Sequence, residues 1–319
     1  MMGAKIAEPK VYRIGNLEIG GERGERPTLL LPSMFHAKDR ILSSRKQGVF
    51  DREKAAEYLR RMEELSQATG VLAIVAMVSN WEDEFRRYVE FYREHTQLPF
   101  ACDVWMVKRR LACAKVIAEL ELQDVFLYNS ITPWDAKDVP LADQVKELRD
   151  LGIRHVMLQA FDETDTTPAG RLKSLDILLE EVNKGGFASI LVDTSCMSLP
   201  SLPYSLAANH MIKEKYGFPC GQATSNGSYM WRKELAERFG PDAFPAVDAA
   251  AEALSVFWDS DFVFCGPVVG IARVMMSAVV GDVMAAVRRY QEKGLLPAPG
   301  HPLERNFPDF LKQLVPSLD

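Results

Sequence analysis

The sequence predicts a single-domain (β/α)8 barrel, the TIM-barrel fold, that follows a short irregular N-terminal segment. Short runs rich in β-branched and aromatic residues alternate with longer amphipathic stretches along the chain, which is typical of parallel β/α units. Eight such runs occur, and eight parallel strands are the number that closes this barrel. The length of 319 residues also agrees with one barrel domain.

The predicted strands are short apolar runs that end in polar or turn-forming residues. They are Thr28–Met34, Val71–Val78, Phe100–Asp103, Val125–Asn129, His155–Ala160, Ala188–Asp193, Pro219–Gln222 and Phe262–Gly266. The predicted helices carry apolar residues at helical spacing. They are Arg52–Ala68, Trp81–Glu94, Val107–Glu119, Leu141–Leu151, Gly170–Asn183, Ser205–Tyr216, Ser228–Phe239, Val247–Trp258 and Ile271–Lys293. Nine helices for eight strands leave one additional helix, which lies before the eighth strand.

The first predicted helix has both a start signal and a buried face. Asp51 stands directly before it, where an N-cap side chain accepts hydrogen bonds from free backbone N–H groups. Ala55, Leu59, Met62 and Leu65 then recur at helical spacing. We expect this apolar face to pack on the wall of the barrel.

Residues 1–27 are expected to form an N-terminal segment, and residues 28–319 the barrel domain. The stretch LEIGGERGERP indicates an irregular chain, because clustered glycines favour turns and Pro27 restricts the entry to the first strand. Such a segment either covers the lower end of the barrel or carries part of a dimer contact.

The composition narrows the classes of partner. A net charge of −6 and a pI near 5.6 argue against a surface for nucleic acid or for an anionic membrane. No apolar run approaches the ~20 residues of a transmembrane helix, and MMGAKIAEPK lacks the apolar core of a signal peptide. The five cysteines have no paired spacing, which is typical of a reduced compartment. We therefore expect a cytoplasmic protein without membrane insertion.

Several common chemistries lack their usual motifs. The chain contains no Gly-x-Ser-x-Gly, no Gly-x-x-x-x-Gly-Lys and no His-Glu-x-x-His, which argues against common hydrolases and kinases. A zinc site needs grouped Cys or His ligands. The five histidines are scattered, and Cys102, Cys220 and Cys265 are single in their strands. We interpret these cysteines as small buried residues and predict no metal bound by this chain.

Polar residues follow four of the predicted apolar runs, FACD, VFLYN, ASILVD and CGQATSN. They are Asp103, Asn129, Asp193 and Asn226. The carboxyl ends of barrel strands open on one face, so these side chains should converge on one pocket. Two carboxylates and two carboxamides suit a flat heterocycle rich in N–H and C=O groups, and a pterin is such a ring.

A series of motifs resembles a known family. IGGERGERPTLL is followed by VFDREKA, FACD, YNSIT, LVDT, TSNGS and HPLERNFPDF. This series resembles the H subunit of tetrahydromethanopterin S-methyltransferase and its bacterial relatives, from about Ile14 to the C-terminal motif. The most specific part is IGG-x-x-G-x-x-P with the later FDRE. The family is similar to the wider class of pterin-dependent methyltransferases, in which a TIM barrel moves a methyl group between a corrinoid and a reduced pterin or folate.

The resemblance implies roles for five residues. Asp103, Asn129 and Asp193 would hold the pterin. Asn226 would lie near the reacting nitrogen, N5, as the residue closest to the chemistry. Tyr229 falls where some pterin methyltransferases have a glutamine, so it is expected to border the substrate or to serve in packing.

The loop after Asp103 departs from the family pattern. Val104 and Trp105 stand where the family usually has Ser-Thr, which reshapes the pterin side or the corrinoid side of the pocket. Trp105 and Trp134 either close an aromatic edge over the pocket or are buried in the core or an interface.

The resemblance implies methyl transfer from a methylcorrinoid protein to N5 of tetrahydrofolate, in the demethylation of glycine betaine or related methylamines. The chain has no Asp-x-His-x-x-Gly run, so a partner protein must carry the corrinoid, methylcobalamin. Cofactors carry the hard chemistry of such a step, which agrees with the lack of a nucleophile motif. Two alternatives are a tetrahydromethanopterin-dependent enzyme and a non-catalytic subunit that presents a corrinoid protein. We also expect a homodimer, from the family and from the frequency of such dimers.

Overall fold

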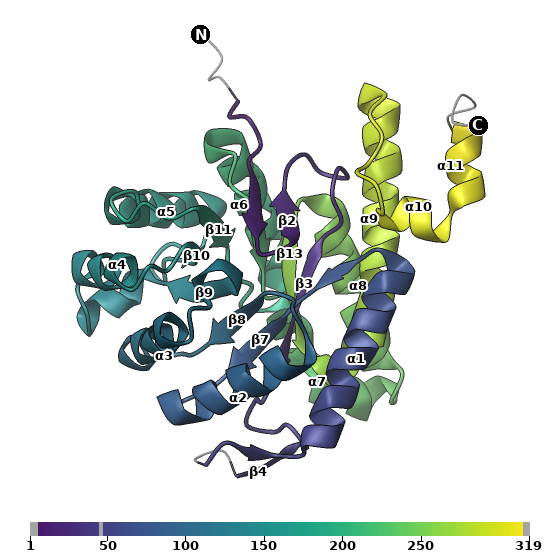
Figure 1. Cartoon of the computed structure of the whole chain (residues 1–319). Helices are drawn as coiled ribbons and strands as arrows, with labels where there is room; N and C mark the ends of the chain where they lie inside the picture. Colours follow the sequence, from purple (N-terminus) through teal and green to yellow (C-terminus); the bar gives the residue numbers. More distant parts are fainter. Residues whose placement is uncertain (1–5, 45–46, 315–319) are drawn as a thin grey trace.

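The computed structural model describes residues 6–44 and 47–314, and within them the chain forms a closed parallel barrel (Figure 1). The barrel strands are β3 (Leu29–Met34), β6 (Leu72–Ala73), β7 (Val75–Val78), β8 (Phe100–Asp103), β9 (Phe126–Ile131), β10 (His155–Gln159), β11 (Ser189–Asp193), β12 (Cys220–Gln222) and β13 (Phe262–Pro267). Neighbouring strands follow chain order, and β13 pairs with β3 to close the ring. β6 and β7 together fill the second position, since both pair with β3. The eight predicted strand positions and the fold class are confirmed.

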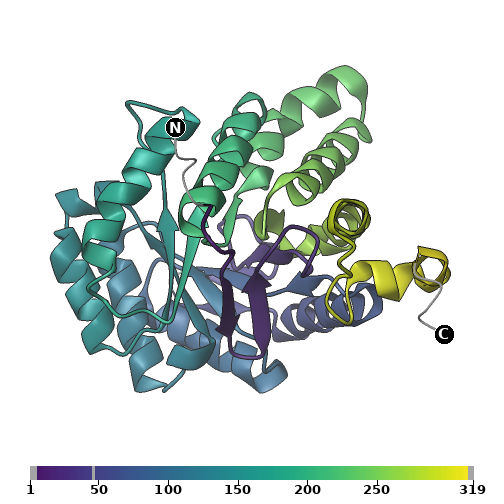
Figure 2. The same ribbon diagram turned by 90° about the horizontal axis from the view of Figure 1, so that it is seen from above.

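The helices surround the strands (Figure 2). They are α1 (Arg52–Thr69), α2 (Glu82–His95), α3 (Val107–Glu119), α4 (Leu141–Asp150), α5 (Pro168–Val182), α6 (Leu202–Tyr216), α7 (Thr224–Phe239), α8 (Ala243–Trp258) and α9 (Ile271–Lys293). Short 3-10 turns are η1 (Gln123–Val125), η2 (Pro133–Lys137), η3 (Leu199–Ser201) and η4 (Val268–Gly270). The additional helix before the last strand is confirmed, because α7 and α8 both lie between β12 and β13. Asp51 caps α1 as predicted, accepting from the Lys54 N–H at 3.1 Å.

Alternating side chains along each strand face the barrel interior or the helices. Leu29 and Leu31 of β3 belong to the interior cluster, whereas Leu30 packs in the layer between strands and helices. In β9, Leu127 faces inward while Phe126 and Tyr128 face the helices. This period of two divides the apolar side chains between the barrel interior and the layer under the helices.

The N-terminal segment closes the lower end of the barrel with a regular element. β1 (Val11–Ile14) and β2 (Leu17–Gly20) form an antiparallel hairpin that lies across the barrel in Figure 2. Ile14 and Ile19 are buried in the interior cluster. The turn uses Gly15 at a φ of 55°, and a Cβ there would lie 3.0 Å from the Pro99 side chain. We expected an irregular chain at Leu17–Pro27, and its first residues are instead a strand.

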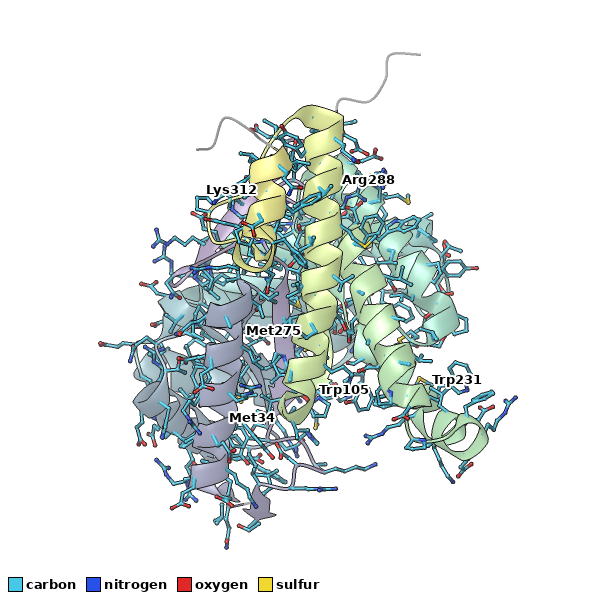
Figure 3. The ribbon with its side chains drawn as sticks, turned by 90° about the vertical axis from the view of Figure 1, so that its right-hand side faces the viewer. Met34, Trp105, Trp231, Met275, Arg288 and Lys312 are labelled. Atoms are coloured by element: carbon cyan, nitrogen blue, oxygen red, sulfur yellow. The ribbon has the colours of Figure 1, made fainter. Side chains whose placement is uncertain are left out.

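Within residues 6–44 and 47–314, one helix is long and apolar enough to span a membrane, which we did not expect from the sequence. An 18-residue window within Val268–Lys293 has a mean hydropathy of 1.7, and 56% of that window is buried. Here α9 contacts α8 and β13 as part of the barrel wall. Figure 3 shows the helix with Met275, which is buried, and Arg288, which is exposed. Just over half of this apolar window is therefore buried against the rest of the barrel.

Further elements appear outside the predicted pattern. β4 (Leu42–Ser44) and β5 (Val49–Phe50) form a short hairpin between the first strand and α1. α10 (Pro302–Asn306) contacts α1 and α9, and α11 (Pro308–Leu314) follows it. The Asn306 side chain donates to the Thr69 carbonyl at 2.9 Å, which ties the C-terminal helices to the end of α1.

A buried carboxyl on α9 anchors the start of the first barrel strand. Asp282 accepts from the Thr28 hydroxyl at 2.8 Å and from its backbone N–H at 3.1 Å. Asp282→Ala leaves the buried Thr28 N–H unpaired, so we expect it to lower the free energy of unfolding by about 1–2 kcal/mol. Urea unfolding monitored by circular dichroism measures this loss.

Because Asp282 titrates, the free energy of unfolding measured in the same experiment should depend on pH. Burial raises the pKa of its carboxyl from an ordinary value of 3.8 to about 7. The folded state therefore keeps a proton that the unfolded state loses, and the contribution to stability falls as pH rises from about 4 through about 7. Asp282→Asn removes this titration, so it should gain stability relative to the wild type between about pH 5 and about pH 8. Identical pH profiles for the two proteins would show that the carboxyl titrates normally.

Candidate functional site

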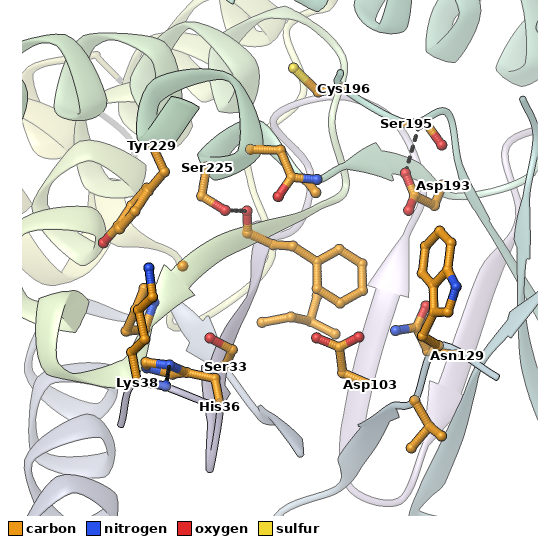
Figure 4. Close-up of a pocket in the computed structure, with 18 of the residues that line it drawn as sticks. Ser33, His36, Lys38, Asp103, Asn129, Asp193, Ser195, Cys196, Ser225 and Tyr229 are labelled. Atoms are coloured by element: carbon orange, nitrogen blue, oxygen red, sulfur yellow. Dashed lines mark hydrogen bonds between the residues drawn. The ribbon is translucent and has the colours of Figure 1, made fainter. Parts of the chain in front are cut away.

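A cavity of about 1170 Å³, lined by both polar and apolar residues, opens at the C-terminal ends of the barrel strands (Figure 4). The five residues singled out from the sequence all line it. They are Asp103, Asn129, Asp193, Asn226 and Tyr229. The strand ends therefore converge as the barrel geometry requires.

Asp103 and Asp193 are the last residues of β8 and β11. Asp193 is buried, and its carboxylate accepts from the Ser195 backbone N–H at 2.7 Å. Burial raises the pKa of Asp193 to about 7, and the nearby Asp103 charge acts in the same direction. The Asp103 side chain is open to water in the cavity, yet the surrounding protein raises its pKa, an effect that the charge of Arg110 opposes. Both acids favour a ligand that donates hydrogen bonds.

Two buried arginines hold the loops that follow these acids. Arg110 of α3 donates to the carbonyls of Val104 and Trp105 at 2.8 and 3.0 Å. It also pairs with the buried Asp135 of η2. These contacts fix the loop after Asp103, because a planar guanidinium binds several acceptors in set directions.

Arg171 of α5 fixes the loop after Asp193 in the same way. It is fully buried and donates to the carbonyls of Thr194 at 2.6 Å and Ser195 at 3.2 Å. Nothing in the spacing of either helix distinguishes these arginines from surface residues, so sequence reasoning missed both.

The floor of the cavity carries two carboxamides between the acids. Asn129 lies within β9, which continues two residues further to Ile131, and its amide donates to the Cys102 carbonyl at 3.1 Å. Gln159 ends β10 and donates to the Ser195 hydroxyl at 2.9 Å. Gln159 was missed although it is the polar end of an apolar run, the same signal that indicated Asp103.

The helix after β12 begins four residues earlier than predicted. α7 starts at Thr224 rather than Ser228, so Asn226 lies in its first turn and not at the end of a strand. Its side chain is exposed at the cavity. Ser228 points the other way and donates to the buried Asp248, which also accepts from Arg273 at 3.0 Å. This network below the helix holds the turn that presents Asn226.

Tyr229 lies at the cavity and is packed against a neighbouring helix at the same time. It lines the cavity, and its ring packs edge to face on Phe244 at a centroid distance of 4.8 Å. Gly266 of β13 makes room for it, since a Cβ there would lie 2.9 Å from the ring and the φ of Gly266 is 79°. The guanidinium of Arg232 lies 5.6 Å from the ring centroid.

An aromatic pair borders the mouth on the side of β8. Trp105 and Trp134 are stacked at a centroid distance of 6.2 Å, and both line the cavity. Trp105 is 77% exposed. The pair is therefore an aromatic edge of the pocket, and Trp105 is not a core residue.

All five cysteines are buried and free. Burial raises the pKa of the Cys102 thiol to about 12, and it raises the pKa values of Cys220 and Cys265 well above the ordinary value. Neutral thiols of this kind behave as small apolar residues. In residues 6–44 and 47–314, no group of three or more His, Cys, Asp or Glu side chains is arranged to hold a metal ion.

These features define a TIM-barrel protein with a large cavity at the C-terminal strand ends, the face on which TIM-barrel enzymes carry their active sites. The chain belongs to the family of the tetrahydromethanopterin S-methyltransferase MtrH subunit, whose sequence model matches residues 7–295. The family resemblance seen in the motifs is thereby confirmed, and the chain is a member of a methyltransferase family.

Relatives match over nearly their full length. The tetrahydromethanopterin S-methyltransferase H subunit of Methanococcus maripaludis is 26% identical over 317 residues, covering 93% of this chain and 98% of the relative. The H subunit of a putative mtx methyltransferase of Methanosarcina barkeri is 25% identical, covering 93% and 97%. Among solved structures, dihydropteroate synthase of Xanthomonas albilineans with 4-aminobenzoic acid has a TM-score of 0.60 at 15% identity, covering 88% of this chain and all of that one. That likeness is one of fold.

Proposed function

We propose that this protein transfers a methyl group from a methylated corrinoid, carried by a partner protein, to N5 of tetrahydrofolate. The observation that carries the proposal is the group Asp103, Asn129 and Asp193 around one cavity in a chain of a methyltransferase family. Carboxylates accept from N–H groups, while a carboxamide both donates and accepts. These residue types match the aminopyrimidine edge of a reduced pterin.

In this reaction the protein would position the reactants and provide electrostatic stabilisation. The partner's corrinoid would supply the methyl group and keep the bonding electron pair, while N5 would bond to the methyl carbon and release its proton to water. Asp103 and Asp193 would fix the ring by accepting from its N–H groups. Asn226 would face N5 as the catalytic residue, because an amide donates or accepts without itself changing charge. Tyr229 would border the ring.

The methyl group would originate from glycine betaine or a related methylamine, through a separate corrinoid protein. We place this chemistry in the cytoplasm, and the five free cysteines agree with a reduced compartment. A non-catalytic docking subunit is less consistent with the chain, because such a role needs no cavity lined by two acids and two amides.

Tetrahydromethanopterin is the second candidate substrate. The relatives that match this chain over most of its length carry tetrahydromethanopterin S-methyltransferase in their names. The same acids and amides would serve its pterin ring, since the two substrates share the groups that these residues would contact.

Parallel titrations with the two pterins test the proposal. Isothermal calorimetry under anaerobic conditions should give a saturable signal with tetrahydrofolate. Methylcobalamin added to the enzyme with tetrahydrofolate should then show a spectral change that needs both components. Binding of tetrahydromethanopterin alone would transfer the proposal to the second candidate. Binding of neither pterin would remove both.

We predict a homodimer in solution. The neighbouring helices α8 and α9 expose Leu254, Trp258, Val280 and Met284, each at least 50% accessible. Large exposed apolar side chains on one face are typical of a protein interface. Light scattering at micromolar concentration should give twice the chain mass, and Val280→Glu with Met284→Glu should give the monomer with an unchanged circular dichroism spectrum. A wild-type monomer would contradict the prediction.

A further inference from the structure

Four cationic side chains gather on one side of the cavity. Lys38 and Arg40 lie in the loop after β3, and Arg232 and Lys233 lie on α7. All four line the cavity and are exposed. β13 links the two groups, because it pairs with β3 and directly contacts α7. We call these four residues the basic side of the cavity.

The charge of the basic side is largely uncompensated. Among the described residues, only Lys233 has a carboxylate within ion-pair distance, and Glu237 lies 3.7 Å away on the exposed surface of the same helix. Asp39 lies between Lys38 and Arg40 and also lines the cavity, with its carboxylate accepting from the backbone N–H groups of Phe35 at 3.0 Å and Ile41 at 3.3 Å, so four cations and one acid leave a net positive charge. Exposed cations elsewhere on this acidic protein do form such pairs, for example on α1 and α4.

The cavity is therefore divided by charge. Asp103 and Asp193 stand at the ends of β8 and β11, where their carboxylates offer hydrogen-bond acceptors to a ligand. The basic side stands across the mouth, around β3 and β13. A ligand that satisfies both has N–H donors at one end and anionic groups at the other. The volume of about 1170 Å³ also exceeds the ~300–1,000 Å³ of ordinary small-molecule pockets, so it leaves room for more than a bicyclic ring.

We propose that the basic side binds the carboxylates of the glutamate tail of a reduced folate, with preference for tails that carry several glutamates. This inference rests on the proposed function, because it assigns the opposite end of the same substrate. Lys38 and Arg40 supply the attraction from one loop, and Lys233 supplies it from α7. Arg232 contributes a charge that is also held over the rings of Tyr229 and Phe244, at 5.6 and 4.9 Å.

Three ligands and two matched variants test the tail site. The ligands are 6-methyltetrahydropterin, which has no tail, tetrahydrofolate with one glutamate, and tetrahydrofolate with three. The test variant is Lys38→Gln with Arg40→Gln. The control is Arg60→Gln with Arg61→Gln on α1, which removes the same charge from exposed residues outside the cavity. Calorimetry gives each affinity at low and at high salt.

The wild type should bind the three ligands more tightly as the tail lengthens, and salt should reduce that gain. The test variant should bind tetrahydrofolate about two- to thirtyfold more weakly, the range for two exposed ion pairs. It should bind the triglutamate form more weakly still and 6-methyltetrahydropterin as the wild type does. The control variant should bind all three ligands normally.

The other outcomes are distinct. Equal affinity of the test variant for tetrahydrofolate, or an equal loss for the ligand without a tail, would overturn the tail site. Normal folate affinity with slower methyl transfer from a corrinoid protein would assign the basic side to that partner and likewise overturn it. A wild type that binds none of the three ligands would instead refute the proposed function.

Discussion

Replacing Asn226 with alanine is expected to lower kcat for methyl transfer about a hundredfold and to change the KM for tetrahydrofolate far less. A preorganised group that stabilises developing charge contributes ~2.7–4 kcal/mol in comparable sites. We expect the lower half of that range, because the charge at N5 is less localised than on an oxyanion. Asn226 is suited to this role by its place in the first turn of α7, exposed to the cavity. Steady-state transfer from methylcobalamin separates the two parameters.

The control for this variant is Asn183→Ala, which removes an exposed amide at the end of α5, away from the cavity. It should leave both parameters unchanged. An Asn226→Ala enzyme with normal turnover but poor saturation would make Asn226 a binding residue only. A double variant that combines Asn226→Ala with Ser228→Ala tests whether the turn positions Asn226, since Ser228 anchors the same turn through Asp248.

Asp193→Asn and Asp103→Asn are each expected to weaken tetrahydrofolate binding about tenfold to a hundredfold while the protein stays folded. The loss of a hydrogen bond to a charged acceptor costs ~1.5–3 kcal/mol. Asp193 is held by the Ser195 N–H and by the loop that Arg171 fixes, so its replacement removes an acceptor that cannot shift elsewhere. Calorimetry measures both affinities. Unchanged binding in the two variants would place the pterin outside this cavity.

The pKa of Asp193, raised by burial to about 7, adds a second readout. Protonation removes an acceptor, so the wild-type affinity for tetrahydrofolate should rise between about pH 6 and about pH 8. Asp193→Asn should show a smaller rise. The matched control is Asp282→Asn, because burial also raises the Asp282 pKa to about 7 but this residue anchors the opposite end of the barrel. It should leave folate binding unchanged at each pH.

Hydrophobic period and turn chemistry were enough to predict the barrel. The runs that became β8 and β11 and the helices α3 and α9 match their predicted ends closely, because apolar spacing there continues up to a clear stop. The N-terminal hairpin was missed although Gly15-Asn16 between VYRI and LEIG is a two-residue turn signal. We gave more weight to the glycines in LEIGGERGERP, which predicted an irregular chain. β4, β5 and α10 are too short for periodicity to reveal.

Only part of the site was predicted, because a linear pattern locates some of its residues and not others. Strand ends fix the direction of Asp103 and Asp193, so a linear pattern locates them. Asn226 was assigned to a strand end because Ala223 to Ser225 read as a continuation of the apolar run, whereas the chain turns into α7 there. Arg110 and Arg171 depend on contacts between segments distant in sequence, which no single pattern of apolar residues encodes.

The hairpin β1–β2 also has a consequence for the order in which reactants bind. Ile14 and Ile19 fill the far end of the barrel. Reactants that meet in the cavity must therefore enter through the same opening, at the C-terminal strand ends. If the proposed function holds, the small methyl acceptor would bind before a protein-bound donor covers this opening, and the methylated product would leave only after the donor dissociates. Binding and release would then follow a fixed order. The exchange of protein partners, rather than the diffusion of folate, would then set the pace of turnover.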